Sequence, residues 1–349
     1  MGSAHEHCPG VTFVMPVYNE VDYVEAAIHS VLSQHYEGPV ELVVALAPST
    51  DGTDEIVHHM ARSDERIRVV DNPDRDIPIG LNRAIAAARH PVVVRVDAHS
   101  ALAPDYTSCA VQTLERTGAA NVGGIMSAVG KPGVQAAVAR GYNSRLGLGG
   151  GAYHAAHAVE GPAESAYLGV MRADVVRSVG GFDESLRRGE DWELNFRLRA
   201  QGHLIWLDPT LSVTYWPRDS WSGLARQFLA TGTWRGELGR RLGARNPVRF
   251  LAPPALVVVV ALSIVVGLLQ LIGVLSGWPA LVASVIYAGP AAYLLVLASA
   301  ALSGGGSVLD RLRYAGVLAT MHLSWGTGFL IGMLRGAGHA VDTSRTRQK

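Results

Sequence analysis

Two short segments of the chain place acidic and imidazole side chains where they can do chemistry. Glu190 and Asp191 stand between a glycine-rich turn and a helical pattern that runs from Trp192 to Ala200. Because a helix N-terminus stabilises an anion, we expect Asp191 to be ionised at neutral pH and to act as a general base, with Glu190 supporting it. The alternative interpretation is that Asp191 only caps the helix, which is the common role of an aspartate there.

The second segment, Asp97-Ala98-His99, directly follows the valine-rich run 92–96. Side chains two residues apart at a strand end can address one ion, and the imidazole favours Mn²⁺ somewhat over the harder Mg²⁺. By itself Asp-x-His is more often part of a turn. Transfer of a sugar from a nucleotide diphosphate to a hydroxyl needs a group that stabilises the departing diphosphate and a base that deprotonates the hydroxyl. A cation at Asp97 and His99 would be the first, and Asp191 would be the second.

Alternating apolar patterns predict the elements that position these residues. We expect strands at 11–17, 40–46, 67–70 and 91–96, and helices at 24–32, 56–61 and 81–88. This alternation predicts an α/β fold with a parallel, doubly wound sheet and right-handed crossovers. Ligands of such sheets bind at the carboxyl ends of the strands, where Tyr18, Asn19 and Asp97 lie.

Composition narrows the partners and the compartment. The 349 residues include 30 basic and 30 acidic ones, so the zero formal charge gives no reason to expect nucleic acid. Cys8 and Cys109 have no metal or disulfide spacing and fit a reducing compartment. The first ten residues, MGSAHEHCPG, form no apolar core and hence no signal peptide, so we expect the soluble part in the cytoplasm.

The second part of the chain reads as membrane-associated. Residues 251–309 contain no charged side chain and no histidine, which is room for two membrane helices at about 253–275 and 279–302. A weaker apolar segment, 314–334, contains His322, and a third crossing there would put Arg335 outside against the positive-inside tendency, so the number of crossings stays open.

The predicted domains therefore fall into four parts. A soluble domain covers 1–220, and a basic amphipathic segment at the membrane interface covers 221–250, with an ordinary surface helix as its alternative. A membrane region covers 251–335, and a basic tail covers 336–349.

Five segments in chain order match the pattern of a known family: PVYNEVDYVEAAIHSVLSQ, STDGT, VDAHS, GGFDE and GEDWELNFRLRAQG. Over roughly residues 10 to 215 the chain resembles the inverting family 2 glycosyltransferases of GT-A fold, a Rossmann-like nucleotide-sugar-binding domain. The Asp-Ala-His triplet, the segments YLGVMRADV, LDPTLSVTYWPR and RQFLATGTWR, and the short membrane region further resemble the succinoglycan-type glucosyltransferases. Those enzymes extend undecaprenyl-diphosphate-linked saccharides.

The resemblance assigns roles to residues of this chain. It implies that Pro16, Tyr18, Asn19, Glu20 and Asp97 line the donor nucleotide pocket, that Asp97 and His99 meet the metal and diphosphate, and that Asp191 is the base. It also places Gly180, Gly181, Phe182 and Trp192 beside the sugar and acceptor, with Arg226, Gln227, Trp234 and Arg235 as further acceptor candidates.

The expected function is metal-dependent, inverting transfer of a hexose, glucose first, from a UDP-sugar to a polyprenyl-diphosphate-linked saccharide at the inner membrane. Membrane lipids are the other expected partner. The chain departs from the family at residues 45–49, where Ala-Leu-Ala-Pro-Ser replaces the common Val-Asp-Asp-Gly-Ser. It therefore lacks the acidic side chain that usually contacts the nucleobase of the donor. Two alternatives remain open: a polyprenyl-phosphate sugar synthase, and a nonenzymatic membrane binding module on a degenerate transferase fold.

Overall fold

The computed structural model describes residues 8–148, 158–243, 247–303 and 305–338. The chain packs as two compact units. The first comprises residues 1–127 and 151–215, and the second comprises residues 128–150 and 216–349. Residues 128–148, which the sequence placed in the soluble domain, therefore pack with the C-terminal part of the chain.

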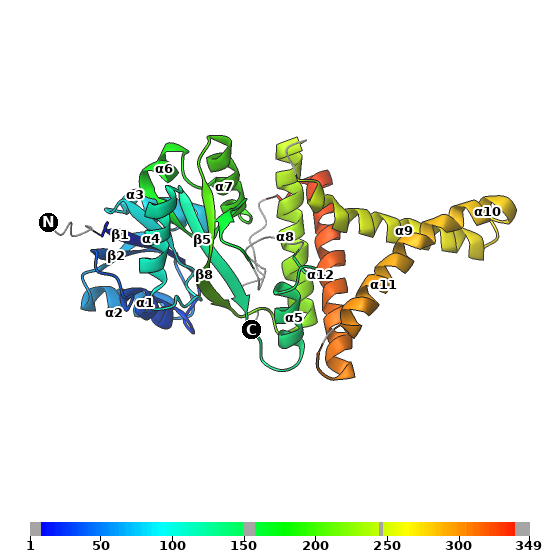
Figure 1. Ribbon diagram of the computed structural model, residues 1–349, viewed down its shortest axis with the longest axis horizontal. Helices are drawn as coiled ribbons and strands as arrows, with labels where there is room; N and C mark the ends of the chain where they lie inside the picture. The colour runs from blue at the N-terminus through cyan, green and yellow to red at the C-terminus, as the bar shows by residue number, and fades with distance from the viewer. Residues whose placement is uncertain (1–7, 149–157, 244–246, 304, 339–349) are drawn as a thin grey trace. The chain divides into compact units, whose positions relative to one another are not determined.

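The first unit is a sheet with helices on its faces (Figure 1). Its strands are β1 (Val11–Val17), β2 (Val40–Leu46), β3 (Ile67–Asp71), β4 (Val92–Arg95), β5 (Asn121–Ala128), β6 (Gly161–Pro162), β7 (Tyr167–Arg172) and β8 (Ile205–Tyr215). Its helices are α1 (Val24–Leu32), α2 (Thr53–Ser63), α3 (Ile77–Ala87), α4 (Tyr106–Thr117), α6 (Ala173–Ser178) and α7 (Glu190–Ala200).

The eight strands pair in the order β3-β2-β1-β4-β7-β5-β8-β6. The parallel pairing predicted for the first four strands is confirmed, with Val11 of β1 level with Val40 of β2 and Val92 of β4. The strand β7, which the sequence pattern did not predict, runs antiparallel to both β4 and β5. Among the described residues between β5 and β7, the helix α5 (Val134–Tyr142) belongs to the second unit and forms no crossover on this sheet, so the chain can return antiparallel.

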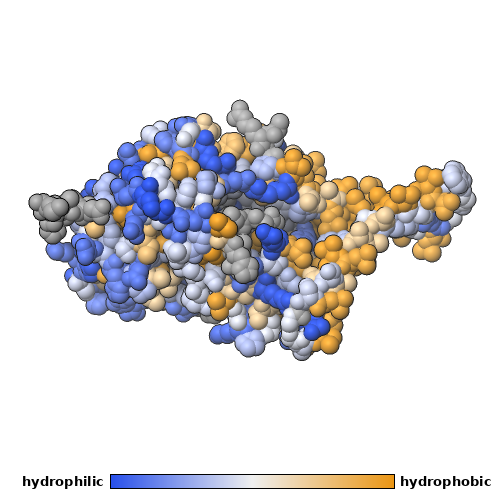
Figure 2. Space-filling model, viewed as in Figure 1, coloured by the Kyte–Doolittle hydropathy of each residue, from blue (hydrophilic) through white to orange (hydrophobic). Residues whose placement is uncertain are grey.

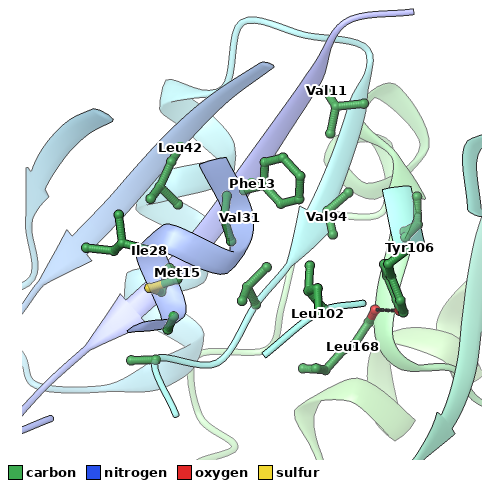
Figure 3. Close-up of a cluster of buried hydrophobic side chains, with 14 of the residues drawn as sticks. Val11, Phe13, Met15, Ile28, Val31, Leu42, Val94, Leu102, Tyr106 and Leu168 are labelled. Carbon is green, nitrogen blue, oxygen red and sulfur yellow. Dashed lines mark hydrogen bonds between the residues drawn. The ribbon is translucent and has the colours of Figure 1, made fainter. Parts of the chain in front are cut away.

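The core of the first unit fills the space between the sheet and the helices on one of its faces (Figure 3). Phe13 and Met15 of β1 are fully buried together with Ile28 of α1. The hydroxyl of the buried Tyr106 donates to the Leu168 carbonyl oxygen at 3.1 Å, which ties α4 to β7. This packing holds the carboxyl ends of β1 and β4, and the first residue of β7, at one edge of the sheet.

The second unit consists of helices. Besides α5 it contains α8 (Trp221–Leu242), η3 (Val248–Leu251), α9 (Ala252–Leu271), α10 (Gly277–Ala283), η4 (Ser284–Tyr287), α11 (Ala288–Leu302) and α12 (Val308–Arg335). Three stretches, 248–271, 277–302 and 308–335, are long and apolar enough to cross a membrane. The predicted weaker segment 314–334 is part of the single helix α12, and most of the predicted basic tail, from residue 339 on, lies outside the described residues.

Candidate active site

The loop after β1 is held against the loop after β2. The Asn19 side chain accepts from the Thr50 backbone N–H at 2.9 Å, and the Glu20 backbone N–H donates to the Thr53 hydroxyl at 2.9 Å. Asp51 accepts from the Thr53 backbone N–H and hydroxyl, and these hydrogen bonds lower its pKa against the opposing effect of burial. The two loops thus give Tyr18, Asn19 and Glu20 a fixed backbone, with Asn19 in the left-handed region at φ 53°.

The structure brings Glu20 to His99. The imidazole Nδ1 lies 3.0 Å from Glu20 Oε1, and because a carboxylate only accepts, Nδ1 is the nitrogen that carries the proton in this hydrogen bond. The Nε2 lone pair of a neutral His99 is then available to a ligand. A carboxylate behind the imidazole is the usual support of a metal-binding histidine.

Arg95, the last residue of β4, connects three carboxylates. Its Nη1 donates to Asp191 Oδ1 and lies 3.1 Å from Glu190 Oε1, while Nη2 lies 3.3 Å from Asp97 Oδ1. The Arg95 side chain is 4% exposed, against 14% for Asp97 and 31% for Asp191. A buried guanidinium therefore joins the expected metal ligand Asp97 to the expected base Asp191.

The three carboxylates outnumber the single guanidinium, and the pKa of Asp191 reflects this. Burial raises the Asp191 pKa to about 7, and the charges of Glu190 and Asp97 act in the same direction while Arg95 opposes them. The sequence predicted an ionised carboxylate that is ready to accept a proton at neutral pH. A pKa of about 7 allows this carboxyl both to accept and to hold a proton near neutrality.

Asp191 does not cap its helix. The N-cap residue of α7 is Gly189, in the left-handed conformation at φ 77°, and Asp191 lies in the first turn. A chain of buried amides holds this turn: Asn195 Nδ2 donates to the Asp191 carbonyl oxygen at 2.8 Å, and Asn121 Nδ2 donates to Asn195 Oδ1 at 2.7 Å. The backbone under Asp191 is thus fixed to strand β5.

The predicted glycine turn is held by its own set of contacts. Gly180 and Gly181 both have positive φ, at 84° and 73°, which explains the glycine pair. Asn82 of α3 accepts from the Phe182 backbone N–H at 2.8 Å and donates to the Phe182 carbonyl at 2.9 Å. Phe182 itself is buried in the core, so the turn positions the chain before α7 and presents backbone atoms.

Trp192 follows Asp191 and stacks on Phe196 of the same helix, with ring centroids 5.4 Å apart. Pro16, near the carboxyl end of β1, pairs with Ala45 of β2 and is partly buried. The guanidinium of Arg75 lies over the ring of Tyr18, 5.6 Å from the ring centroid. The backbone of Arg75 is in the left-handed region, at φ 54°. A side chain in the left-handed region costs conformational energy, and such residues gather at binding sites.

The other acceptor candidates belong to the second unit. Arg226 is exposed on α8, and Gln227 is partly exposed beside it. Trp234 and Arg235 are 7% and 8% exposed, and the Arg235 guanidinium lies 3.8 Å from the ring centroid of Phe250. These two side chains are packing residues of the second unit.

Sequence reasoning missed Arg95 and Tyr167 as site residues. Burial raises the Tyr167 pKa well above its ordinary value, and Asp97 adds to the shift, so the hydroxyl stays protonated and able to donate. For Arg95 a signal was present, because an arginine inside a run of valines in a buried strand requires charged partners. Tyr167 opens β7, an element that the sequence pattern did not place.

The described residues contain no group of three or more His, Cys, Asp and Glu side chains placed to hold a metal ion. A divalent cation that is bound mainly through phosphate oxygens and water needs only one or two protein ligands. Asp97, with His99 supported by Glu20, fits that case, and the surplus of carboxylates around Arg95 favours a cation nearby.

Comparisons with known proteins identify the family of the chain. The family described as "Glycosyl transferase family 2" matches residues 12–147. The succinoglycan biosynthesis protein ExoA of Rhizobium meliloti is 32% identical over 325 residues, which cover 90% of this chain and 92% of that protein.

Two further similarities concern a second curated protein and a solved structure. The dolichyl N-acetyl-α-D-glucosaminyl phosphate 3-β-D-2,3-diacetamido-2,3-dideoxy-β-D-glucuronosyltransferase of Methanococcus voltae is 23% identical over 276 residues, covering 76% of this chain and 84% of that protein. The structure of the mannosyltransferase PcManGT from Pyrobaculum calidifontis, in complex with GDP-Man and Mn²⁺, has a TM-score of 0.57 at 19% identity. That superposition covers 95% of this chain and 88% of PcManGT, and it shows that the two share a fold.

Proposed function

Because the chain belongs to glycosyl transferase family 2 and has the GT-A fold, we propose that it transfers a hexose from a nucleotide diphosphate sugar to a lipid-linked saccharide in exopolysaccharide assembly. Glucose from UDP-glucose is the first candidate donor. The observation that carries the proposal is the joining of Asp97 and Asp191 through the buried Arg95, because it puts a diphosphate-side carboxylate and a base at one edge of the sheet.

In this proposal Asp191 accepts the proton of the incoming acceptor hydroxyl. Its pKa of about 7 suits a general base that must take up a proton near neutral pH. Transfer then occurs by a single displacement, which inverts the anomeric centre and requires no enzyme nucleophile. Arg95 and the amide chain of Asn195 orient the carboxylate.

The donor diphosphate would lie near Asp97 and His99. A Mn²⁺ or Mg²⁺ ion held by these two side chains would supply positive charge to the leaving diphosphate. The presence of Mn²⁺ with GDP-Man in PcManGT supports this assignment. Tyr18, Asn19 and Pro16 would line the nucleotide, and Arg75 over Tyr18 is an additional candidate for that pocket.

Two observations support a lipid-linked acceptor. The relatives are named for succinoglycan biosynthesis and for transfer to a dolichyl-phosphate-linked sugar. The three apolar stretches of the second unit are long enough to place the enzyme at a membrane, where such an acceptor resides. The catalytic unit would work at the cytoplasmic face.

The test is a transfer assay with the full-length protein in detergent. A panel of labelled nucleotide sugars is incubated with polyprenyl-diphosphate-linked saccharides, and with polyprenyl phosphate as a separate acceptor. We expect label from UDP-glucose to enter the diphosphate-linked saccharide, and Asp191→Asn to lose this activity while Glu25→Gln, on the exposed face of α1, retains it. Transfer only to polyprenyl phosphate would instead identify a polyprenyl-phosphate sugar synthase, and no transfer from any donor would overturn the proposal.

A further inference from the structure

Helices α8 and α12 of the second unit lie side by side (Figure 1), and glycines line the contact between them. A side chain at Gly232 would collide with the carbonyl oxygen of Trp325, and one at Gly236 would collide with that of Phe329. The contacts advance by four residues on both helices in the same direction. The two helices are therefore parallel, with backbones in direct contact.

The glycines of α12 repeat the pattern from the other side. A side chain at Gly328 would meet the Leu229 carbonyl oxygen, and one at Gly332 would meet that of Thr233. Each helix thus presents two glycines four residues apart, the spacing that allows helices to approach closely. The pair is a tightly joined structural element.

The contact between the two helices continues along most of their length. Near the start of α8, the Trp221 ring lies against Gly316 of α12, and near its end a side chain at Gly336 would meet the Glu237 carboxylate. The chain therefore leaves α8 at one end of the pair and enters α12 at the opposite end. At 1.5 Å per residue, the 22 residues of α8 separate these ends by roughly 33 Å.

The connection between the two helices is an apolar hairpin. It consists of α9 going out and α10, η4 and α11 coming back, and hydrophobic residues cover this arm (Figure 2). The hairpin leaves beside the middle of the pair, where the Pro253 carbonyl faces Gly326, and returns near the start of α8, where Ala300 packs on Tyr314 and Leu318. In an 18-residue window of each of its two apolar stretches, only 11% and 0% of the residues are buried inside the protein.

These observations constrain the position of the pair in a membrane. Two crossings by the hairpin return the chain to the side from which it started, so both ends of the α8–α12 pair must lie on that side. A pair standing across the bilayer would have its ends on opposite sides. It would also place the charged residues of α8, including the exposed Arg226, at hydrocarbon depth, which is unfavourable.

We propose that α8 and α12 lie together along the membrane surface as a two-helix platform, that only the α9–α11 hairpin enters the bilayer, and that Arg335 lies on the same side as the start of α8. The lipid surface is the partner of this platform. Exposed apolar side chains at Leu312, Leu334, Trp221 and Leu229 suit the acyl boundary, and the exposed Arg226 and Arg240 suit anionic headgroups.

Cysteine labelling of the full-length protein tests the sidedness. In a Cys8→Ser, Cys109→Ser background, single cysteines replace Ser276 at the hairpin tip, Ser303 before α12, Ala337 after α12, and Glu25 on the catalytic unit as reference. Right-side-out and inside-out vesicles are treated with a membrane-impermeant maleimide. We expect Ser303→Cys and Ala337→Cys to be labelled in the same preparation as Glu25→Cys, and Ser276→Cys in the other.

Labelling of Ala337→Cys together with Ser276→Cys would overturn the proposal, because α12 would then cross the membrane. A second experiment tests the parallel pair with a short bis-maleimide linker. Trp221→Cys with Gly316→Cys should cross-link, and the matched pair Trp221→Cys with Ala337→Cys should not; the reverse result would remove the premise. Neither experiment measures sugar transfer, so a negative outcome leaves the proposed enzymatic function standing.

Discussion

Replacing Arg95 by methionine tests the central charge arrangement of the site. Methionine keeps much of the length of the side chain and removes the charge that faces Asp97, Glu190 and Asp191. Since Arg95 opposes the rise of the Asp191 pKa, its loss should raise that pKa further above about 7. The base would then be protonated over more of the neutral range.

The size of the effect follows from how Arg95 is shared. Removing one partner of a buried ion pair costs about 3–5 kcal/mol, and a third of that for one of three carboxylates is about 1–1.7 kcal/mol. One pKa unit corresponds to about 1.4 kcal/mol, so the Asp191 pKa should rise by about one unit. At pH 7 the ionised fraction then falls from about one half to about one tenth, a roughly fivefold loss in kcat/KM.

The assay is the pH profile of kcat/KM for the donor, from pH 5.5 to 9.5, with wild type, Arg95→Met and Arg95→Lys. In Arg95→Met the loss should shrink as the pH rises. Lysine keeps the charge but cannot bridge three carboxylates, so Arg95→Lys should raise the Asp191 pKa less than Arg95→Met does. An unchanged apparent pKa in folded Arg95→Met would refute the view that Arg95 sets the protonation of Asp191.

Three further outcomes are expected. Asp191→Asn should lower kcat by roughly 10²- to 10⁴-fold with donor binding retained in an equilibrium titration, and Glu190→Gln should have a milder effect; near-normal turnover in Asp191→Asn would exclude it as the base. Transfer should stop in EDTA and return with Mn²⁺ at least as well as with Mg²⁺, and His99→Ala should weaken the apparent Mn²⁺ affinity; full activity after chelation would exclude a metal. Because the Asp191 pKa rises from 3.8 to about 7 on folding, its contribution to stability is complete below pH 3.8 and is lost as the pH rises through about 7, by at most about 4 kcal/mol. Thermal unfolding without cation or donor should therefore show a steeper loss of stability between pH 5 and 8 in wild type than in Asp191→Asn, and equal slopes would contradict the raised pKa.

The sequence predicts the first half of the sheet well because the periodicity there is unambiguous. β1, α1 and β2 have the predicted bounds, since valine-rich runs and helical spacing alternate with clear turns between them. Beyond residue 105 the pattern loses this regularity. The antiparallel β7 and its Tyr167 could not be predicted, because strand direction depends on where the intervening segment packs.

In the candidate site, too, the sequence predicts some features and the fold alone reveals others. Residue type and position at a strand or helix end single out Asp97, His99 and Asp191 from the sequence. The partner of Asp191 is Arg95, 96 residues earlier, and only the fold reveals that contact. Likewise the glycine spacing in α8 and α12 is visible in the sequence, but which helix each glycine faces is not.

The acceptor candidates on α8 have to be interpreted with their burial in mind. Trp234 is 7% exposed, and replacing a buried tryptophan with alanine costs about 3–5 kcal/mol of stability, so a loss of transfer in such a variant follows from packing alone. Arg235, over the Phe250 ring, has the same ambiguity. Arg226 is exposed, and its replacement leaves the contacts of the helix pair in place. Among the α8 arginines predicted to meet the acceptor, Arg226 is therefore the one whose substitution separates acceptor binding from folding.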